Sequence, residues 1–235
     1  MAAPTSSAAT PYTGVENLEV MREAENYNRY LFQLVQRNAG TATRIIDFGA
    51  GSGTFAVRSA ALGVEVTAVE PDQRLRALLA DHGLRVAADT TSLPDRGFDY
   101  AYTLNVLEHI HDDVQALRQL RSKLVPGGRL LIYVPAFPVL FTRMDAKVGH
   151  VRRYTRRTLR DCVSSAGFTV EAIRYADSLG FLATLVFKLI GSGDGELDRR
   201  AVRLYDRLVF PLSRALDVLT HRWFGKNLML LARNT

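Results

Sequence analysis

The stretch Asp47-Phe48-Gly49-Ala50-Gly51-Ser52-Gly53 decides the fold of this 235-residue chain. It continues a short buried strand that begins at Ile45 and Ile46, and it precedes a helical pattern over residues 54–62. Glycines at such a turn let the backbone pass close beneath a ligand and adopt angles that other residues resist. The first backbone N–H groups of the following helix have no partner within the helix, and they point toward the same ligand. The stretch therefore predicts a ligand-binding turn between a strand and a helix.

Strands and helices alternate on both sides of this turn. Further strands are expected at residues 64–69, 84–88, 98–104, 129–134, 168–175 and 227–232, and helices at 15–38, 73–82, 112–124 and 156–166. An irregular loop is expected at residues 135–154 and a largely helical insertion at 178–223. This order predicts an α/β fold with a mostly parallel sheet flanked by helices. We expect one domain over residues 15–235, after a disordered tail at residues 1–14.

The bulk composition is that of an ordinary globular protein, with 47% apolar and 23% charged residues. A net charge of +6 suits an acidic partner, but it also fits a generally basic surface. Cys162 is the single cysteine, which excludes an internal disulfide and a zinc site made of several thiolates. The most apolar stretch, residues 179–187, is far shorter than the ~20 residues that span a bilayer. We expect a cytoplasmic protein.

Glu70 ends the second expected strand, 23 positions after Asp47. A carboxylate at this point can accept hydrogen bonds from both ribose hydroxyls of a nucleoside cofactor. Nicotinamide and flavin enzymes share this feature, but their glycines follow the pattern G-x-G-x-x-G, which leaves room for a pyrophosphate. Here Gly53 arrives one residue early. That spacing favours a cofactor without phosphates, and a nicotinamide-dependent oxidoreductase remains an alternative.

Four ordered motifs between about Tyr27 and Gly167 resemble the class I S-adenosylmethionine-dependent methyltransferases, in particular their type 11/23 small-molecule branch. The motifs are Ile45-x-Asp47-x-Gly49-x-Gly51-x-Gly53, Glu70-Pro71-Asp72, Asn105-Val106-Leu107-Glu108-His109-Ile110 and Leu124-Val125-Pro126-Gly127-Gly128. The resemblance implies a Rossmann-like fold with a seven-stranded, mostly parallel sheet and a helical insertion before the last strand. It also implies that S-adenosyl-L-methionine is the cofactor.

The resemblance assigns cofactor roles by position. Gly49, Ala50, Gly51 and Gly53 would run beneath the methionine part, and Asp47 would brace this loop or meet the sulfonium side through water. Glu70, followed by Pro71, would hold the ribose, while Asp89, with Thr90 beside it, would contact the adenine amino group. Asn105 and Val106 would lie near the methionyl group. Tyr27 would belong to an N-terminal lid over the cofactor, or would simply pack on the sheet.

The methyl acceptor is expected near the block Gly149-His150-Val151-Arg152-Arg153-Tyr154, which follows the fifth strand. Methyl transfer mainly requires alignment, and a general base is needed only for a protonated acceptor such as a hydroxyl. An imidazole can accept a proton near neutral pH. We therefore predict catalytic roles for His150 and Tyr154 and substrate binding by Arg152, Arg153 and His109. The alternative is that this block only anchors a loop to a helix.

Two other functions fit the sequence less well. Residues 108–113 contain Glu-His-Ile-His-Asp-Asp and could suggest a metal site, but Asp112 and Asp113 are good residues for opening a helix, so no metal is expected. Enzymes that methylate base amino groups carry Asn/Asp-Pro-Pro-Tyr/Phe where this chain has Asn105-Val106-Leu107-Glu108. Cys162 is expected in the middle of a helix, where it is poorly placed to attack a cytosine base. No nucleic-acid partner is expected.

The insertion contains apolar residues at helical spacing, surrounded by arginines, and Pro211 should kink it. The apolar stripe comprises Leu197, Ala201, Leu204, Leu208, Leu212, Ala215 and Leu219, and the arginines are Arg199, Arg200, Arg203, Arg207 and Arg214. We expect the stripe to pack on the sheet as a lid that walls an apolar pocket. The alternative is peripheral contact with an anionic membrane.

These observations together predict a biosynthetic methyltransferase that acts on oxygen or nitrogen of a small, partly apolar metabolite. A carboxylate or hydroxyl of a natural-product or lipid-linked intermediate is the favoured acceptor. A subunit that binds the cofactor without catalysis is a further alternative. The chain is expected to be a monomer or a homodimer.

Overall fold

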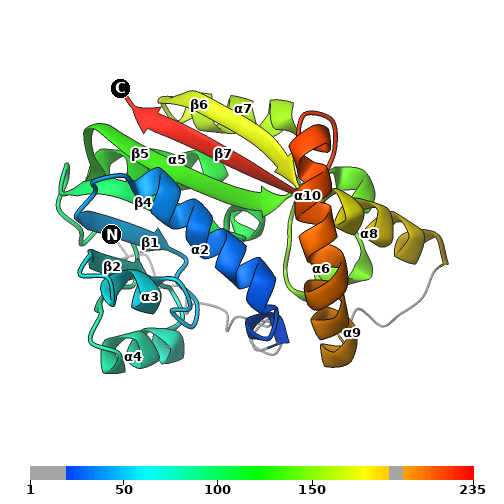
Figure 1. The fold of residues 1–235 in the computed structure, drawn as a ribbon. Coiled ribbons are helices and arrows are strands. Elements are labelled where there is room, and N and C mark those ends of the chain that lie inside the picture. The colour runs from blue at the N-terminus through cyan, green and yellow to red at the C-terminus, as the bar shows by residue number, and fades with distance from the viewer. Residues whose placement is uncertain (1–19, 191–197) are drawn as a thin grey trace, which may run out of the picture.

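A computed structural model describes residues 20–190 and 198–235, and within these ranges the chain forms one seven-stranded sheet (Figure 1). The strand order is β3-β2-β1-β4-β5-β7-β6, and β7 alone runs antiparallel to its neighbours. The strands are β1 (Arg44–Phe48), β2 (Glu65–Val69), β3 (Arg85–Ala87), β4 (Phe98–Leu104), β5 (Leu124–Pro135), β6 (Phe168–Ala176) and β7 (Asn227–Asn234). The predicted Rossmann-like sheet is confirmed. The predicted tail, residues 1–14, lies outside the described residues.

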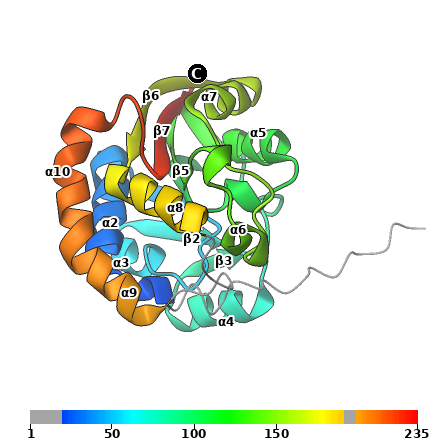
Figure 2. The same cartoon turned by 90° about the vertical axis from the view of Figure 1, so that its right-hand side faces the viewer.

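Helices cover both faces of the sheet, with α2 and α10 on one face and α5 and α7 on the other (Figures 1 and 2). The helices are α2 (Glu25–Ala39), α3 (Ala56–Ala60), α4 (Gln73–Asp81), α5 (Asp113–Lys123), α6 (Arg143–Lys147), α7 (Arg156–Ser165), α8 (Ser178–Ile190), α9 (Arg199–Leu204) and α10 (Phe210–Thr220). Short 3-10 segments are η1 (Leu107–His109) and η2 (Pro138–Leu140), and η3 (Tyr205–Val209) is π-helical.

The core lies between the sheet and these helices. Leu120 of α5, Ile132 of β5 and Leu159 of α7 are fully buried on one side, and Leu31 of α2 is buried on the other. The predicted boundaries of α7 are confirmed, because Thr155 caps its first turn and Gly167, with φ +92°, follows its end.

The expected irregular loop at residues 135–154 is more ordered than predicted. It contains η2 and α6, and α6 begins with a capping box in which the Asp145 carboxylate accepts hydrogen bonds from the backbone N–H and the hydroxyl of Thr142 at 2.8 and 2.9 Å. The pair Thr142-x-x-Asp145 was a local helix-start signal that the sequence interpretation missed. Most of the remaining helices and strands lie within a few residues of their expected positions. The helix expected at residues 15–38 is interrupted at residues 23–24, so that α2 begins at Glu25, and β5 begins at Leu124, earlier than the expected residue 129.

The expected packing of the insertion is wrong. Leu204, Leu208, Leu212 and Leu219 are 55–68% exposed, so the apolar stripe faces away from the sheet. Leu197 lies outside the described residues. The opposite side of the same helices faces inward and carries the buried residues Asp206, Phe210, Ser213 and Asp217, which are spaced by three and four.

Besides Phe210, the inward side carries polar residues, and its two aspartates accept hydrogen bonds from the first amide groups of two other helices. The Asp206 carboxylate accepts hydrogen bonds from the backbone N–H groups of Asn26 and Tyr27 in α2, each at 2.9 Å. The Asp217 carboxylate accepts from the N–H groups of Asp177 and Ser178 at the start of α8, also at 2.9 Å. Helix N-termini leave such groups without intrahelical partners. These caps fix the insertion with its polar side inward.

Candidate active site

The glycine turn after β1 lies directly against the loop after β4. Gly49 has φ +81°, and a Cβ atom on it would come 2.4 Å from Cγ2 of Val106, so no larger residue fits without displacement. Asn105, the residue before Val106, also has a positive φ of 56°. Because β1 and β4 are parallel neighbours, both loops leave the same carboxyl edge of the sheet. The structure therefore brings the predicted methionine-binding and methionyl-contacting residues together.

Asp47 is buried beneath this turn. Its carboxylate accepts a hydrogen bond from the hydroxyl of Tyr102 at 2.8 Å, a partner that the sequence interpretation did not identify. The two residues face each other in the pairing of β1 with β4, which is the signal that a register prediction could have used. Burial, opposed by the hydrogen bond from Tyr102 and assisted by the neighbouring charge of Glu70, raises the pKa of Asp47 to about 7.

Glu70 links the turn to the end of β2. Its Oε2 accepts from the backbone N–H of Gly51 at 2.8 Å, and its Oε1 accepts from that of Asp72 at 2.9 Å, across Pro71. Burial raises the pKa of Glu70 despite these bonds. Each carboxylate oxygen has a second lone pair, so the side chain can still accept ribose hydroxyls.

The acidic character of this edge tests which cofactor fits. Asp47 and Glu70 are buried carboxyls whose pKa values are raised, and such groups gain from a nearby positive charge. A cofactor with a sulfonium and an ammonium supplies that charge, whereas a pyrophosphate would add repulsion. The residues present therefore fit S-adenosylmethionine.

The predicted adenine contacts follow β3. Asp89 is exposed, and its Oδ1 accepts hydrogen bonds from the hydroxyl and the backbone N–H of Thr91, which lower its pKa. Thr90 is buried beside it. Asp89 and Glu70 lie after adjacent parallel strands, and the N–H of Glu70 bonds the carbonyl of Ala87 at 2.9 Å. The ribose and adenine candidates are therefore neighbours along the sheet edge.

Tyr27 on α2 packs on the sheet, and its place in a lid over the cofactor stays a prediction. Its ring packs edge-on against Tyr133, at 6.2 Å between centroids, and against Phe210 of the insertion, at 5.6 Å. Its hydroxyl oxygen accepts a hydrogen bond from Nδ2 of Asn105 at 3.3 Å. The residue therefore packs on the sheet and also reaches the loop expected beside the methionyl group.

A cavity of about 440 Å³ borders the same turn on the side of α2. It is lined by residues of the turn and of the helix, among them Ser52, Gly53, Thr54, Asn28 and Arg29. A second cavity of about 550 Å³ lies between α2 and α10 and contains the arginines Arg29, Arg37, Arg174 and Arg214.

Next to the loop after β4, three side chains form a chain of contacts. The Asp145 Oδ1 lies 2.7 Å from Nδ1 of His150, and Nε2 of His150 lies 3.8 Å from Oε1 of Glu108. His109 packs edge-on against His150, with ring centroids 4.7 Å apart. The structure thus brings the predicted catalytic residue His150 and the predicted substrate-binding residue His109 together, and adds Asp145 and Glu108.

The pKa values of three residues in this cluster differ strongly from their ordinary values. Burial would raise the pKa of Asp145, but the bonds from His150 and Arg153 outweigh it and hold that pKa well below its usual range. Burial raises the pKa of Glu108 to about 8, and both its carboxylate oxygens lack a hydrogen-bond partner among the described residues. Burial, with the nearby charge of His150, lowers the pKa of His109 to about 4. Asp145 is therefore ionised at neutral pH, while His109 and most of Glu108 are uncharged.

The same cluster is where a divalent cation would fit best in the described part of the chain. Ligand atoms of Glu108, His109 and His150 lie within 4.8 Å of one another. The two aspartates of the metal site considered from the sequence do not join this cluster. Asp112 caps α5 by accepting from the N–H of Gln115, and Asp113 accepts from the hydroxyl of Tyr154. Two imidazoles and a carboxylate are a donor set that zinc accepts.

Arg152, Arg153 and Tyr154 are engaged inside the protein. Arg153 donates two hydrogen bonds to Asp145, at 2.8 and 3.0 Å, and Arg152 donates to Asp113 at 2.7 Å. The hydroxyl of buried Tyr154 donates to Asp113 at 2.6 Å, and burial with this bond raises its pKa far above its usual range. These contacts support the anchoring alternative for the three residues. Their predicted catalytic and substrate roles stay predictions.

Comparisons with known proteins agree with this geometry. A family model described as a methyltransferase domain matches residues 23–173. A probable S-adenosylmethionine-dependent methyltransferase of Mycolicibacterium smegmatis is 28% identical over 205 residues, which cover 82% of this chain and 74% of that protein. A ubiquinone biosynthesis O-methyltransferase of a Caulobacter species is 31% identical over 99 residues, covering 38% of this chain and 39% of that protein.

A solved structure shares the fold across the whole chain. It is a Burkholderia thailandensis 1,6-didemethyltoxoflavin-N1-methyltransferase with bound 1,6-didemethyltoxoflavin and S-adenosylhomocysteine, with a TM-score of 0.57, 18% identity, and coverage of 100% of this chain and 93% of that one. The family match favours a methyltransferase over the nicotinamide-dependent oxidoreductase that the sequence left as an alternative. The chain belongs to the methyltransferase-domain family and is a class I S-adenosylmethionine-dependent methyltransferase.

Proposed function

We propose that this enzyme methylates oxygen or nitrogen of a small, partly apolar metabolite, with a hydroxyl or carboxylate as the favoured acceptor. The observation that carries the proposal is the Asp145–His150 pair, at 2.7 Å, beside the loop that contains Asn105. The related proteins named above include an O-methyltransferase and an N-methyltransferase of small molecules, which supports the acceptor class. A natural-product or lipid-linked intermediate fits this class.

His150 is the proposed general base. Asp145 is ionised and can only accept hydrogen bonds, so Nδ1 of His150 carries a hydrogen, and in the neutral imidazole Nε2 has the lone pair that a general base needs. A carboxylate that orients an imidazole in this way fixes both its tautomer and its direction. The bound cofactor supplies a methyl group on a positively charged sulfur. His150 would remove the proton of an acceptor hydroxyl during transfer, while Glu70 and Asp47 hold the cofactor side.

A carboxylate acceptor would not need this base. It is already ionised at neutral pH, and alignment alone then accelerates the transfer. Uncharged His109, beside His150, would position either acceptor through hydrogen bonds. The dependence of turnover on His150 therefore separates the two acceptor chemistries.

The first experiment uses S-adenosylmethionine with a labelled methyl group, incubated with the enzyme and a cell extract of the source organism, followed by partition between organic and aqueous phases. Label in the organic phase supports an apolar acceptor, and label in a new aqueous metabolite contradicts that part of the proposal. Tight cofactor binding without any labelled product would favour a non-catalytic cofactor-binding subunit.

The second experiment compares His150→Asn with His111→Asn, an exposed histidine in the same region. For a hydroxyl acceptor we expect kcat to fall by roughly 10²–10⁴-fold in His150→Asn only, with unchanged binding of S-adenosylhomocysteine. Full turnover of His150→Asn would remove the general-base role and favour the carboxylate. Turnover that is lost on treatment with a chelator and restored by zinc would instead assign Glu108, His109 and His150 to a metal.

A further inference from the structure

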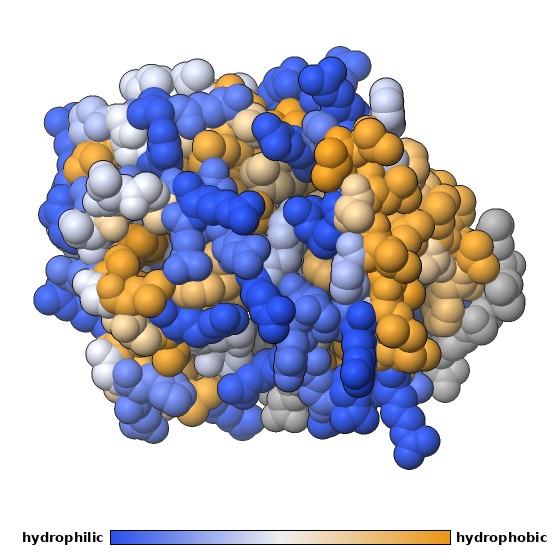
Figure 3. All heavy atoms as spheres, in the orientation of Figure 1, coloured by the Kyte–Doolittle hydropathy of each residue, from blue (hydrophilic) through white to orange (hydrophobic). Residues whose placement is uncertain are grey.

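A large apolar surface lies on the insertion, on α8 and along α9, η3 and α10. Figure 3 shows it as an extended apolar area on the side of the molecule where Figure 1 places α8 and α10. Its members are between 46% and 72% exposed and represent nine of the fourteen exposed large apolar side chains in the described ranges. They are Leu182, Val186, Phe187, Leu204, Leu208, Leu212, Val218, Leu219 and Trp223, hereafter the apolar face.

The fold does not account for this surface. The inward side of the same helices is held by hydrogen bonds to Asp206 and Asp217 and by the bond from the Ser213 hydroxyl to Asp177 at 2.9 Å. The outward apolar side chains are therefore not needed to attach the insertion. Concentrated exposed apolar surface of this kind marks a binding surface in a folded protein.

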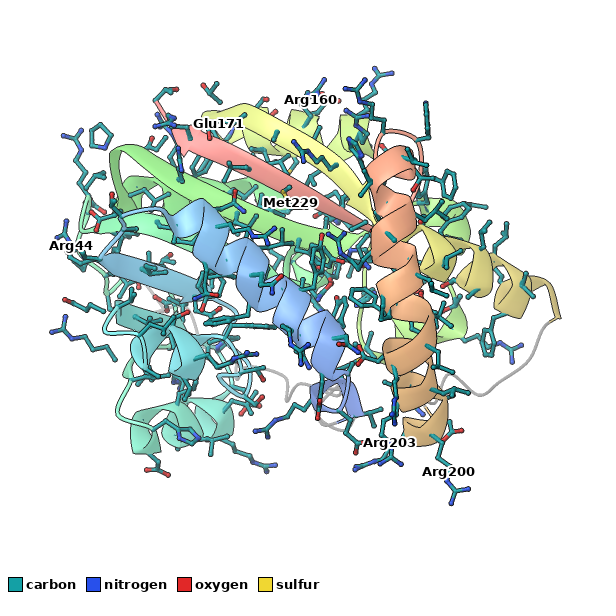
Figure 4. The ribbon with its side chains drawn as sticks, viewed as in Figure 1. Arg44, Arg160, Glu171, Arg200, Arg203 and Met229 are labelled. Carbon is teal, nitrogen blue, oxygen red and sulfur yellow. The ribbon has the colours of Figure 1, made fainter. Side chains whose placement is uncertain are left out.

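Exposed basic side chains lie on or next to the helices that carry the apolar face. In the described part of residues 178–223, the exposed basic side chains outnumber the single exposed acid, Asp198, because the other two acids, Asp206 and Asp217, are buried. Figure 4 shows Arg200 and Arg203 projecting from α9, where the α9–α10 segment begins. These exposed basic residues, hereafter the basic rim, are Lys188, Arg199, Arg200, Arg203, Arg207 and Arg222.

We propose that the apolar face docks on the surface of an anionic lipid bilayer, with α8 and the α9–α10 segment lying in the plane of the membrane. Apolar side chains would enter the boundary between head groups and acyl chains, and the basic rim would meet the lipid phosphates. In the described ranges, no helix combines the length and apolarity that a membrane crossing requires. A two-fold dimer through the same face would bring two basic rims together, so charge favours the bilayer over a second copy.

The docked face would adjoin the acceptor side of the active site. Helix α8 lies across the carboxyl end of the sheet in Figure 2, and Nζ of Lys188 donates a hydrogen bond to the carbonyl of Val139 in η2 at 2.7 Å. This η2 segment belongs to the stretch between β5 and α7 that also carries His150. An acceptor with an apolar tail could therefore enter from the bilayer. This consequence rests on the proposed function, whereas the docking itself does not.

The test is co-sedimentation of the whole protein with vesicles, which requires no methyl acceptor. We expect at least about tenfold stronger binding to vesicles of phosphatidylglycerol and phosphatidylcholine than to phosphatidylcholine alone, with weakening at high salt. The triple variant Leu204→Ser/Leu212→Ser/Leu219→Ser should lose about tenfold or more in binding. Its matched control is Leu62→Ser, a 59% exposed leucine outside the insertion, which should bind like the wild type.

Two further measurements keep the outcomes distinct. The double variant Arg200→Gln/Arg207→Gln tests the rim without changing an apolar residue, and it should reduce binding to anionic vesicles only. Binding of S-adenosylhomocysteine by each variant reports on the cofactor site separately. The proposal is overturned if wild-type protein stays in the supernatant with anionic vesicles, or if the triple serine variant binds like the wild type. A lipid-free dimer that the triple variant converts to monomer would assign the face to self-association instead.

Discussion

Gly49 shows how a single residue joins two loops of the cofactor site. Its positive φ and its closeness to Val106 are separate constraints, because the first concerns the backbone and the second a neighbouring side chain. Gly63 has the same φ of 81° but no atom within 4 Å of a Cβ placed on it. The two glycines therefore form a matched pair in which only the contact differs.

We predict that Gly63→Ala lowers the free energy of unfolding by about 1 kcal/mol and that Gly49→Ala lowers it by roughly 2–4 kcal/mol, because displacement of Val106 adds to the backbone strain. Only Gly49→Ala should weaken cofactor binding. Urea unfolding and calorimetry with S-adenosylhomocysteine measure the two effects. Equal losses in both variants would show that the Val106 contact carries no energy.

Glu108 should make stability depend on pH. Its folded pKa of about 8 lies above its ordinary value of 4.5, so its favourable contribution is complete below pH 4.5 and is lost as the pH rises through about 8. We predict that Glu108→Gln removes this decline, which amounts to roughly 1.4 kcal/mol per unit of pKa difference. Urea unfolding of both proteins at pH 5, 6.5 and 8 measures it. The low pKa of His109 affects both proteins alike, so parallel curves would contradict the prediction.

At the scale of helices and strands, local signals were enough for most of the chain. Thr155 and Gly167 mark the two ends of α7 where the sequence predicted them, because a helix cap depends on only a few neighbouring residues. The orientation of the insertion could not be predicted in this way. Its inward side is determined by hydrogen bonds that Asp206 accepts from backbone N–H groups of α2, which lie 179 and 180 positions away in sequence. Periodicity indicates two sides of a helix, but it does not say which side has a partner.

Asp206 should contribute more to the free energy of unfolding than an ordinary helix cap does. It is buried and accepts two backbone hydrogen bonds from α2, whereas exposed Asp198 accepts one from Arg200 in its own helix. We predict a loss of roughly 2–3 kcal/mol in the free energy of unfolding for Asp206→Ala and about 0.5–1 kcal/mol for Asp198→Ala. Cofactor affinity should fall only in Asp206→Ala, because α2 carries Tyr27. Unchanged affinity there would mean that the cap does not position Tyr27.

For the whole molecule, the cofactor half of the site could be predicted and the acceptor half only partly. Asp47 lies in the last part of β1 and Glu70 directly follows β2, so the spacing of the motifs located both residues. The His150 cluster depends on Asp145 of α6 and Glu108 of η1, which lie in separate elements. Its chemistry therefore emerged only when the chain was folded.

Cofactor binding should couple stability to pH across the molecule. The pKa of Asp47 is about 7, and a cation bound nearby favours its ionised form, so affinity for S-adenosylmethionine should fall as the pH drops below 7. At a cofactor concentration of 100 times Kd, binding adds ~2.7 kcal/mol to the free energy of unfolding. Thermal unfolding with and without cofactor at pH 6 and 8 should show the larger shift at pH 8. Asp47→Asn should remove this difference, and a shift independent of pH in wild type would exclude the coupling.

The inward polar residues of η3 and α10 have one more consequence. Because attachment of this helix depends on Asp206, Ser213 and Asp217, the outward residues can change their hydrophobicity with little cost to folding. Folding and surface chemistry are thus encoded on opposite sides of one helix and can evolve independently. Relatives of this protein could differ widely in how firmly they adhere to other surfaces while retaining the same architecture.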